Sequence, residues 1–174
     1  MSLANVASPR GFLLYGQGGA QGVHRVRRRV AITRSKDLMA GDAYTILADG
    51  TVRRAVTGGE PNGIVEGIEL NSPSQGVESQ DYIKTTEAGY IIGIEDPLAM
   101  FRVQTSDDFE ELNIGDKCDV VDADGDTTLA QSRQKVGSFG GGAQDFRVVD
   151  LVRDTASNAF GTNAWLVVRL LNTL

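Results

Sequence analysis

The sequence is poor in residues that cross-link a chain or build a metal centre. It has one cysteine, Cys118, and one histidine, His24, among 174 residues. A single cysteine forms no intramolecular disulfide, and one residue of each kind cannot supply a cysteine–histidine metal cluster. We therefore expect no metal and no cofactor.

Long apolar runs are also missing. No stretch approaches the roughly 20 residues of a membrane-spanning helix, and the apolar letters of residues 11–16 are too few for a signal peptide. We expect a soluble protein made in a cytoplasm, without a membrane partner. The chain is 41% hydrophobic, which favours a folded core. Its 21 glycines against four prolines indicate many turns between short elements.

Acidic residues are absent from the first 36 positions. Those positions hold seven of the chain's 17 basic residues and carry +7. The other 138 residues hold 10 basic and 23 acidic side chains, a net charge of −13. So sharp an asymmetry indicates different roles for the two parts.

We interpret residues 1–36 as a basic, extended arm and residues 37–174 as a β-rich globular domain. Glycines and a proline before residue 23 disfavour a helix, and arginines alternate with apolar residues from Arg25 to Arg29, as in a strand. The arm is expected to hold an acidic protein surface through arginine–carboxylate pairs. The residues assigned to this contact are Arg10, Arg25, Arg27, Arg28 and Arg29.

Two alternatives to a protein-binding arm stay open. Nucleic acid is an unlikely partner because the acidic remainder repels a polyanion. Only Phe12 and Tyr15 could stack on bases there. The other alternative is a plain solvated strand.

Beyond residue 36 the pattern is one of short strands and tight turns. We predict an all-β fold, an antiparallel β-sandwich or a small β-barrel of jelly-roll or β-tulip type. A single helical turn with Ser106 as its cap is the one exception. The predicted strands lie within residues 43–47, 51–56, 62–70, 81–94, 99–105, 117–121, 127–132, 144–154 and 163–172.

Two Asp-Gly pairs are predicted to form hairpin turns. Asp49-Gly50 and Asp124-Gly125 each stand between predicted strands, and glycine suits the positive φ of such turns. Residues around Asp124 also resemble a calcium loop. Alignment on Gly125 places Val120 and Gln131 where carboxylate ligands belong, so we favour the turn.

A weak internal repeat accompanies these turns. Residues 37–55 and 111–130 both read acidic-Leu-x-x-Gly-Asp, then a strand, Ala-Asp-Gly and a second strand. Either this order of turns and strands is simply common in β proteins, or the domain holds two similar hairpin units that face one core.

No residue pattern predicts catalysis. His24 lies among arginines with no nucleophile nearby in sequence, and Cys118 occupies an apolar-alternating strand position typical of a buried thiol. The glycine-rich stretches precede no predicted helix, so they do not predict a phosphate loop. We expect a protein without enzymatic activity.

Three patterns mark the C-terminal part. They are a Pro-x-x-x-Phe-x-Val-Gln strand, a Gly-x-x-x-Asp strand and an end similar to Leu-Val-Asp-x-x-x-Asn-x-Phe-Gly-x-Asn-Ala-x-x-x-Val-x-Ile-Asn. The matching residues are Pro97, Phe101, Val103, Gln104, Gly115, Asp119, Leu151, Val152, Asn158, Phe160, Gly161, Asn163, Ala164, Val168 and Asn172, and Arg153 stands one place before the acidic residue, Asp154. These patterns resemble those of the head decoration, or cement, proteins of tailed bacteriophages. The likeness covers roughly residues 35–174 and is strongest after residue 90.

The resemblance implies a virion protein that binds the outside of the capsid and clamps neighbouring major capsid proteins, without enzymatic activity. The arm's arginines would then meet carboxylates of capsid subunits. Such proteins assemble as trimers or dimers, and we expect a homotrimer, with a homodimer as the alternative. The strand at residues 164–171, apolar on both faces, favours self-association. A tail or baseplate protein with a β-sandwich fold is the alternative function.

Overall fold

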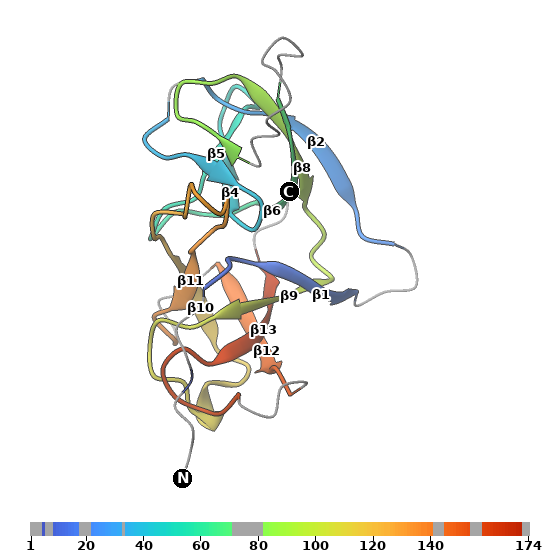
Figure 1. The fold of residues 1–174 in the computed structure, drawn as a ribbon. Coiled ribbons are helices and arrows are strands. Elements are labelled where there is room, and N and C mark those ends of the chain that lie inside the picture. The colour runs from blue at the N-terminus through green and yellow to red at the C-terminus, as the bar shows by residue number, and fades with distance from the viewer. Residues whose placement is uncertain are drawn as a thin grey trace.

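The protein is all-β, with antiparallel sheets in a sandwich-like arrangement (Figure 1). The computed structural model describes residues 5, 9–17, 22–32, 34–70, 82–140, 145–153 and 158–171. Its strands are β1 (Leu13–Gln17), β2 (Arg25–Arg29), β3 (Leu38–Met39), β4 (Ala43–Ile46), β5 (Val52–Arg54), β6 (Gly63–Leu70), β7 (Tyr82–Ile83), β8 (Gly89–Ile94), β9 (Ala99–Gln104), β10 (Lys117–Val121), β11 (Lys135–Gly137), β12 (Phe146–Leu151) and β13 (Trp165–Leu170).

Two groups of strands repeat one arrangement. The first half consists of β2, β4, β5, β6 and β8, and the second half consists of β9 to β13, with β1 added outside β9. The spatial orders are β2-β8-β6-β4-β5 and β9-β13-β12-β10-β11. They are identical when the strands of each half are numbered in chain order. Figure 1 shows the two halves stacked one on the other.

The registers of the two halves agree as well. The fourth strand of each half has a bulge at the same place, after Val65 in β6 and after Val148 in β12. The Gly-Asp pair of the sequence repeat leads into the second strand of each half, and both glycines have positive φ. The same two backbone hydrogen bonds join Gly41 and Asp42 to Val65, and Gly115 and Asp116 to Val148. The repeat is therefore structural and extends over five strands.

Each half closes on itself at its edges. A parallel bridge joins Val30, just after β2, to Val52 of β5, and another joins Thr105, just after β9, to Val136 of β11. The N–H groups of Ala31 and Ser106 donate to the carbonyls of Val52 and Val136 at these points. Closure covers part of the edge that an open sheet presents to other chains.

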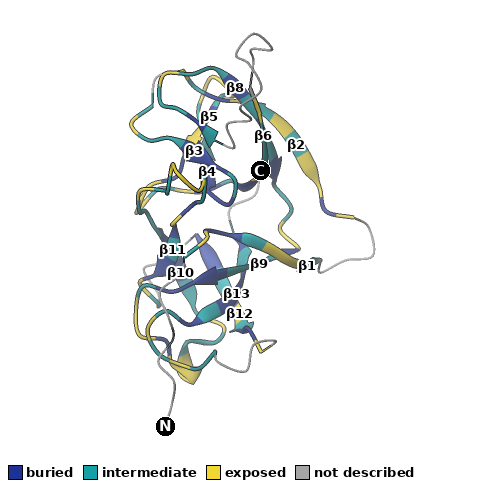
Figure 2. Ribbon diagram, viewed as in Figure 1, coloured by how far each residue is buried: buried dark blue, intermediate teal, exposed yellow. Residues whose placement is uncertain are grey.

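The core consists of two clusters (Figure 2). One fills the first half around Tyr44, Val52 and Ile91. The larger one fills the second half and continues to the interface, where Ile64 and Ile94 of the first half join it. Burial of this continuous apolar surface holds the halves together.

The Asp49-Gly50 turn is as predicted. Strands β4 and β5 form a hairpin, and Gly50 has a φ of +78°. The carboxylate of Asp49 accepts hydrogen bonds from the backbone N–H and the hydroxyl of Thr51. A short turn residue that bonds its own backbone two positions on is a common turn device.

The Asp124-Gly125 prediction is wrong. Strand β10 pairs with β11, so residues 122–134 form a long connection, and Gly125 is not among the residues with positive φ. Position 125 favours glycine for a different reason, because a Cβ there would lie 2.3 Å from the Sδ of Met39. The predicted strand at 127–132 is reduced to a bridge between Asp126 and Gln131.

The helical turn is shorter and later than predicted. A 3-10 turn, η1 (Glu111–Asn113), is preceded by Glu110 rather than Ser106. The backbone N–H of Glu110 donates to the side-chain oxygen of Asn113. Ser106 stands four residues before Glu110, too far from η1 to be its cap, and its hydroxyl donates to Asp107.

The N-terminal segment is not a free arm over its described residues. Strand β1 pairs with β9, and β2 pairs with β8, so both lie within the sheets. Phe12 and Val30 are buried, and the ring of Phe12 stacks on Phe146 at 4.6 Å. These described strands of the predicted arm therefore share sheets with strands of the predicted globular domain. Residues 1–4, 6–8, 18–21 and 33 of the predicted arm lie outside the described residues.

Candidate protein-binding surfaces

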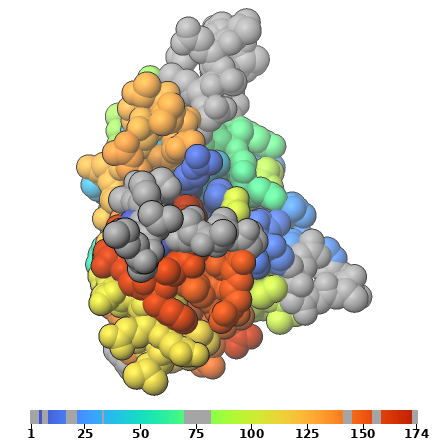
Figure 3. Space-filling model, turned by 60° about the horizontal axis from the view of Figure 1, so that its bottom comes forward, coloured from blue at the N-terminus to red at the C-terminus, as the bar shows by residue number. Residues whose placement is uncertain are grey.

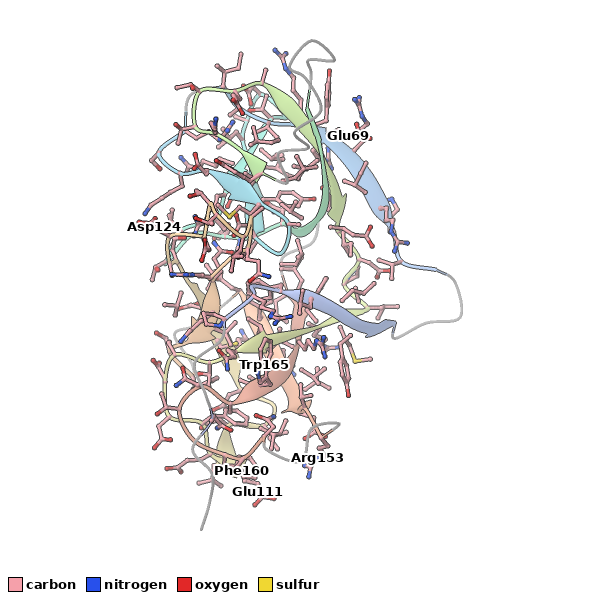
Figure 4. The ribbon with its side chains drawn as sticks, viewed as in Figure 1. Glu69, Glu111, Asp124, Arg153, Phe160 and Trp165 are labelled. Carbon is pink, nitrogen blue, oxygen red and sulfur yellow. The ribbon has the colours of Figure 1, made fainter. Side chains whose placement is uncertain are left out.

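Two exposed arginines of β2 are paired with glutamates of β6. Arg25 donates from Nε and Nη2 to the two carboxylate oxygens of Glu66, at 2.5 and 2.8 Å. Arg27 donates to Glu69 at 2.6 Å, and its guanidinium lies 3.5 Å from the centre of the Tyr90 ring. Figure 4 shows Glu69 beside β2. The hydrogen bond from Arg25 lowers the pKa of Glu66.

Arg28 is held more deeply. It donates two hydrogen bonds, of 2.8 and 2.6 Å, to Glu95, which also accepts a 2.6 Å bond from the hydroxyl of Tyr44. Burial acts to raise the pKa of Glu95, but these donors hold it below its usual value. Arg28 therefore belongs to an internal network.

Arg10 and Arg29 complete the predicted contact set. Both are exposed, and neither makes an ion pair among the described residues. Three of the five predicted contact arginines are thus neutralised within the chain. The five do not form one open basic surface. The ion pairs that join β2 to β6 across β8 link residues 41 and 42 positions apart, which the sequence alone did not indicate.

His24 and Cys118 lie apart, in the first and the second half. His24 is exposed beside β2, and its backbone N–H donates to Asp96 at 3.3 Å. Cys118 is fully buried in the second half, and burial raises the pKa of its thiol. No group of metal-ligating side chains occurs among the described residues. No helix in the described part of the chain is long and apolar enough to cross a membrane.

The described surface has hollows that could receive a ligand or a partner side chain. A cavity of about 350 Å³ between the halves is lined mainly by apolar side chains, including Phe12, Ile64 and Phe101, with Arg10 and Glu66 also in its wall. Another, of about 420 Å³, is lined by Arg34, Ser35, Lys36, Arg53, Arg54 and Val56.

The cations of the second hollow are mostly engaged. Lys36 pairs with Asp124, and Arg34 donates to four backbone carbonyls. Arg54 is buried and pairs with Asp122 at 2.7 Å. Arg53 alone among them has neither hydrogen bond nor ion pair in the described structure.

A buried charge cluster ties the halves together around Arg54. Its Nε lies 3.7 Å from the carboxylate of Asp42, and its Nη2 bonds Asp122 in the connection after β10. Burial raises the pKa of Asp42 to about 6, against the opposing effect of Arg54. The charges of this cluster are used within the fold rather than offered to a ligand.

The outer side of the second half has a row of three cations. Register places Lys117 opposite Arg147, and Arg147 opposite Arg169, on β10, β12 and β13. We call these three residues the basic row. Their sequence neighbours Cys118, Phe146, Val168 and Leu170 are buried, so the row faces outward. Arg102 of β9 lies on the same side, diagonal to Arg169.

Among the described residues, no side-chain ion pair or hydrogen bond neutralises the basic row. Its three side chains and Arg102 are partly exposed, and none bonds to a carboxylate among the described residues. The Nε of Arg147 is buried without any hydrogen-bond partner. Directly opposed like charges destabilise a sheet, so this arrangement has a cost within the isolated chain.

The basic row was not predicted from the sequence. Each member is one basic residue at an outward position of a separate predicted strand, and only the pairing of β10, β12 and β13 brings them together. Alternation could have shown that each points outward. The register, which depends on the bulge after Val148, could not be deduced.

The residues that carry the phage-like pattern build the connection between β12 and β13. The amide of Asn158 donates to the carbonyls of Val152 and Trp165 and accepts from the N–H of Trp165. Gly161 and Asn163 both have positive φ. Phe160 is 42% exposed and stacks on Phe109. Figure 4 shows Phe160 with Glu111 and Arg153 at the end of the second half.

Neither a scan of protein-family models nor searches of curated proteins and solved structures found a match for the chain.

Proposed function

We propose that the chain is a non-enzymatic structural protein of a tailed-phage virion. It binds the outer surface of the capsid and links adjacent major capsid proteins. The observation that carries the proposal is the C-terminal pattern from Asn158 to Ala164. It resembles that of phage decoration proteins, and it forms an ordered connection in the second half.

The all-β fold supports the proposal because such a scaffold presents rigid strand faces to a partner. The only histidine is exposed, and the only cysteine is buried in another part of the molecule. These placements fit a binding role better than acyl or proton transfer.

The proposed partner is the major capsid protein, and the proposed location is the capsid exterior, after synthesis in the host cytoplasm. Self-association as a homotrimer, or alternatively a homodimer, belongs to this proposal. Nucleic acid remains an unlikely partner because the chain carries a net charge of −6.

Co-sedimentation tests the function. Purified chain is mixed with DNA-free heads, and separately with tails, of the phage that encodes it. We expect the chain to pellet with the DNA-free heads and not with the tails. Pelleting with tails alone would replace this proposal with the tail or baseplate alternative.

A further inference from the structure

We propose that the basic row formed by Lys117, Arg147 and Arg169 is a docking surface for a carboxylate-rich surface of a partner protein. The inference rests on the protein-binding role proposed above, but not on the capsid as the partner. The two halves differ at this surface.

The equivalent row of the first half is already an interface. Register matches Lys117, Arg147 and Arg169 to Ala43, Ile64 and Ile94 of β4, β6 and β8. Those three side chains are fully buried and belong to the cluster shared with the second half. The same outer side of one fold thus contacts the other half in the first half, whereas in the second half its side chains are partly exposed in the described part of the chain.

The residues of the second half change the chemistry of that surface. Small and aliphatic side chains in the first half correspond to three cations in the second, so an apolar partner would strand buried charges. A carboxylate-bearing partner would instead supply charge-assisted hydrogen bonds to the exposed parts of these three cations.

Other charged residues lie next to the basic row. Arg102 adds a fourth cation on this side, and Asp119, two residues from Lys117 on β10, adds one carboxylate. Asp150 is neutralised by Arg153 at 3.0 Å. The surface is therefore net positive on a chain whose overall charge is −6.

Apolar residues accompany the cations. Met100 lies opposite Arg169, and Trp165 shares the outward side of β13; both are partly exposed. Arginine, methionine and tryptophan are enriched in protein interfaces. Figure 3 shows the second half from its end, where the orange and red residues of the C-terminal strands reach the surface. The mixture favours a folded acidic surface over a nucleic-acid backbone, because Met100 and Trp165 would pack against the side chains of a folded partner.

The test measures binding of a fluorescent decaglutamate peptide to the full chain by anisotropy, at about 50 mM salt, where screening is weak. The first variant carries Arg147→Gln and Arg169→Gln. The matched control carries Arg25→Gln and Arg27→Gln, which removes the same charge from arginines already paired with Glu66 and Glu69. A decanucleotide of single-stranded DNA serves as the second probe.

We expect the row variant to bind decaglutamate about tenfold more weakly than the wild type, with the control within about twofold. Lys117→Gln with Arg102→Gln should give a similar loss, which keeps the test open if the first variant fails to fold. Equal losses in row variant and control would overturn the proposal, as would row-dependent binding of DNA but not of decaglutamate. Loss of decaglutamate binding can be scored without phage heads, so a failed capsid assay is distinguishable from a failed basic row.

Discussion

Tyr44 in the first half and Cys118 in the second occupy equivalent positions, each as the second residue of the strand that follows a Gly-Asp pair. The large ring of Tyr44 lies against Gly63 and Gly93. The small thiol of Cys118 has Phe146 and Val168 at the corresponding positions. The equivalent core sites of the two halves are thus filled in opposite ways. The first half has one large side chain against two glycines, and the second half has one small side chain against two larger ones.

This exchange predicts a strong coupling between Tyr44 and Gly93. A Cβ at Gly93 would lie 2.1 Å from the hydroxyl oxygen of Tyr44, so Gly93→Val should lower the free energy of unfolding by about 2–3 kcal/mol. Adding Tyr44→Cys should recover about 1 kcal/mol or more relative to additivity. Chemical denaturation measures the cycle. Gly67→Val, whose Cβ would meet only Ile92 at 3.9 Å, is the matched control. Strict additivity would contradict this account of the core.

Gly50 and Gly125 should fail for different reasons when changed to valine. Gly50→Val should cost about 1 kcal/mol or more through its positive φ, because open space surrounds its Cβ. Gly125→Val should be destabilising through contact with Met39. A second substitution, Met39→Val, should therefore offset part of the Gly125 effect and none of the Gly50 effect. Thermal melts of the four variants decide the matter, and equal responses to Met39→Val would refute it.

Asp145 should make the protein less stable at neutral pH than at mildly acidic pH. Burial raises its pKa from 3.8 to about 6, with the charges of Asp119 and Glu60 acting in the same direction. Between these values the folded state binds more protons than the unfolded state. The free energy of unfolding contributed by this group therefore falls as pH rises from about 4 to 6.

Asp145→Asn keeps an oxygen for the N–H of Val120 and removes the charge. We expect it to be more stable than the wild type at pH 7 by about 1–2 kcal/mol, with no difference near pH 4. Asp49→Asn is the control of opposite sign, because hydrogen bonds from Thr51 lower the pKa of Asp49. Urea unfolding at both pH values measures this, and a less stable Asp145→Asn at pH 7 would contradict it.

Truncation tests the placement of the N-terminal strands. Deleting residues 1–30 removes β1, β2 and the buried Phe12, Val23 and Val30, so the remainder should not fold cooperatively. Deleting residues 1–8 removes, among described contacts, only those of Asn5 with Ala159 and Thr162. That shorter variant should melt as the wild type does. A cooperative melt after the longer deletion would restore the independent arm.

Self-association is the remaining prediction. Light scattering at micromolar concentration, without capsid, should report a homotrimer. The apolar strand that suggested this in the sequence is β13, which lies between β9 and β12 within one chain, and its buried residues are therefore explained without a partner. Expectation of the trimer now depends on the family resemblance, and a strictly monomeric mass would oppose it.

Local patterns predicted the strands well because alternation depends on the burial of nearby residues. Strands β4 to β6, β8 to β10, β12 and β13 all lie within predicted stretches. The failures concern pairing over long distances. Arg25 appeared unpaired because Glu66 is remote in sequence, and Asp124-Gly125 resembled a hairpin turn because β11 was not recognised as the partner of β10.

The repeat illustrates the same limit. The repeated Gly-Asp and Ala-Asp-Gly sequences indicated two hairpins. The hydrogen bonds that the two halves share, however, join each Gly-Asp pair to Val65 or Val148, and no short sequence pattern indicates that contact. Side chains of the two halves differ at most matched positions. Their likeness therefore lies in backbone register, which a sequence without a structure does not display.

The placement of β1 has a consequence for the order of events during synthesis. The first half draws its strands from residues 25–94, and the second from residues 99–170, so each can assemble from a continuous piece of chain. Strand β1 leaves the ribosome before either, yet its partner β9 emerges only after the whole first half. Because domains form as their residues emerge, the earliest strand to be made is among the later ones to dock. Strand β1 then pairs with β9, which attaches the beginning of the chain to the second half after the first half has formed.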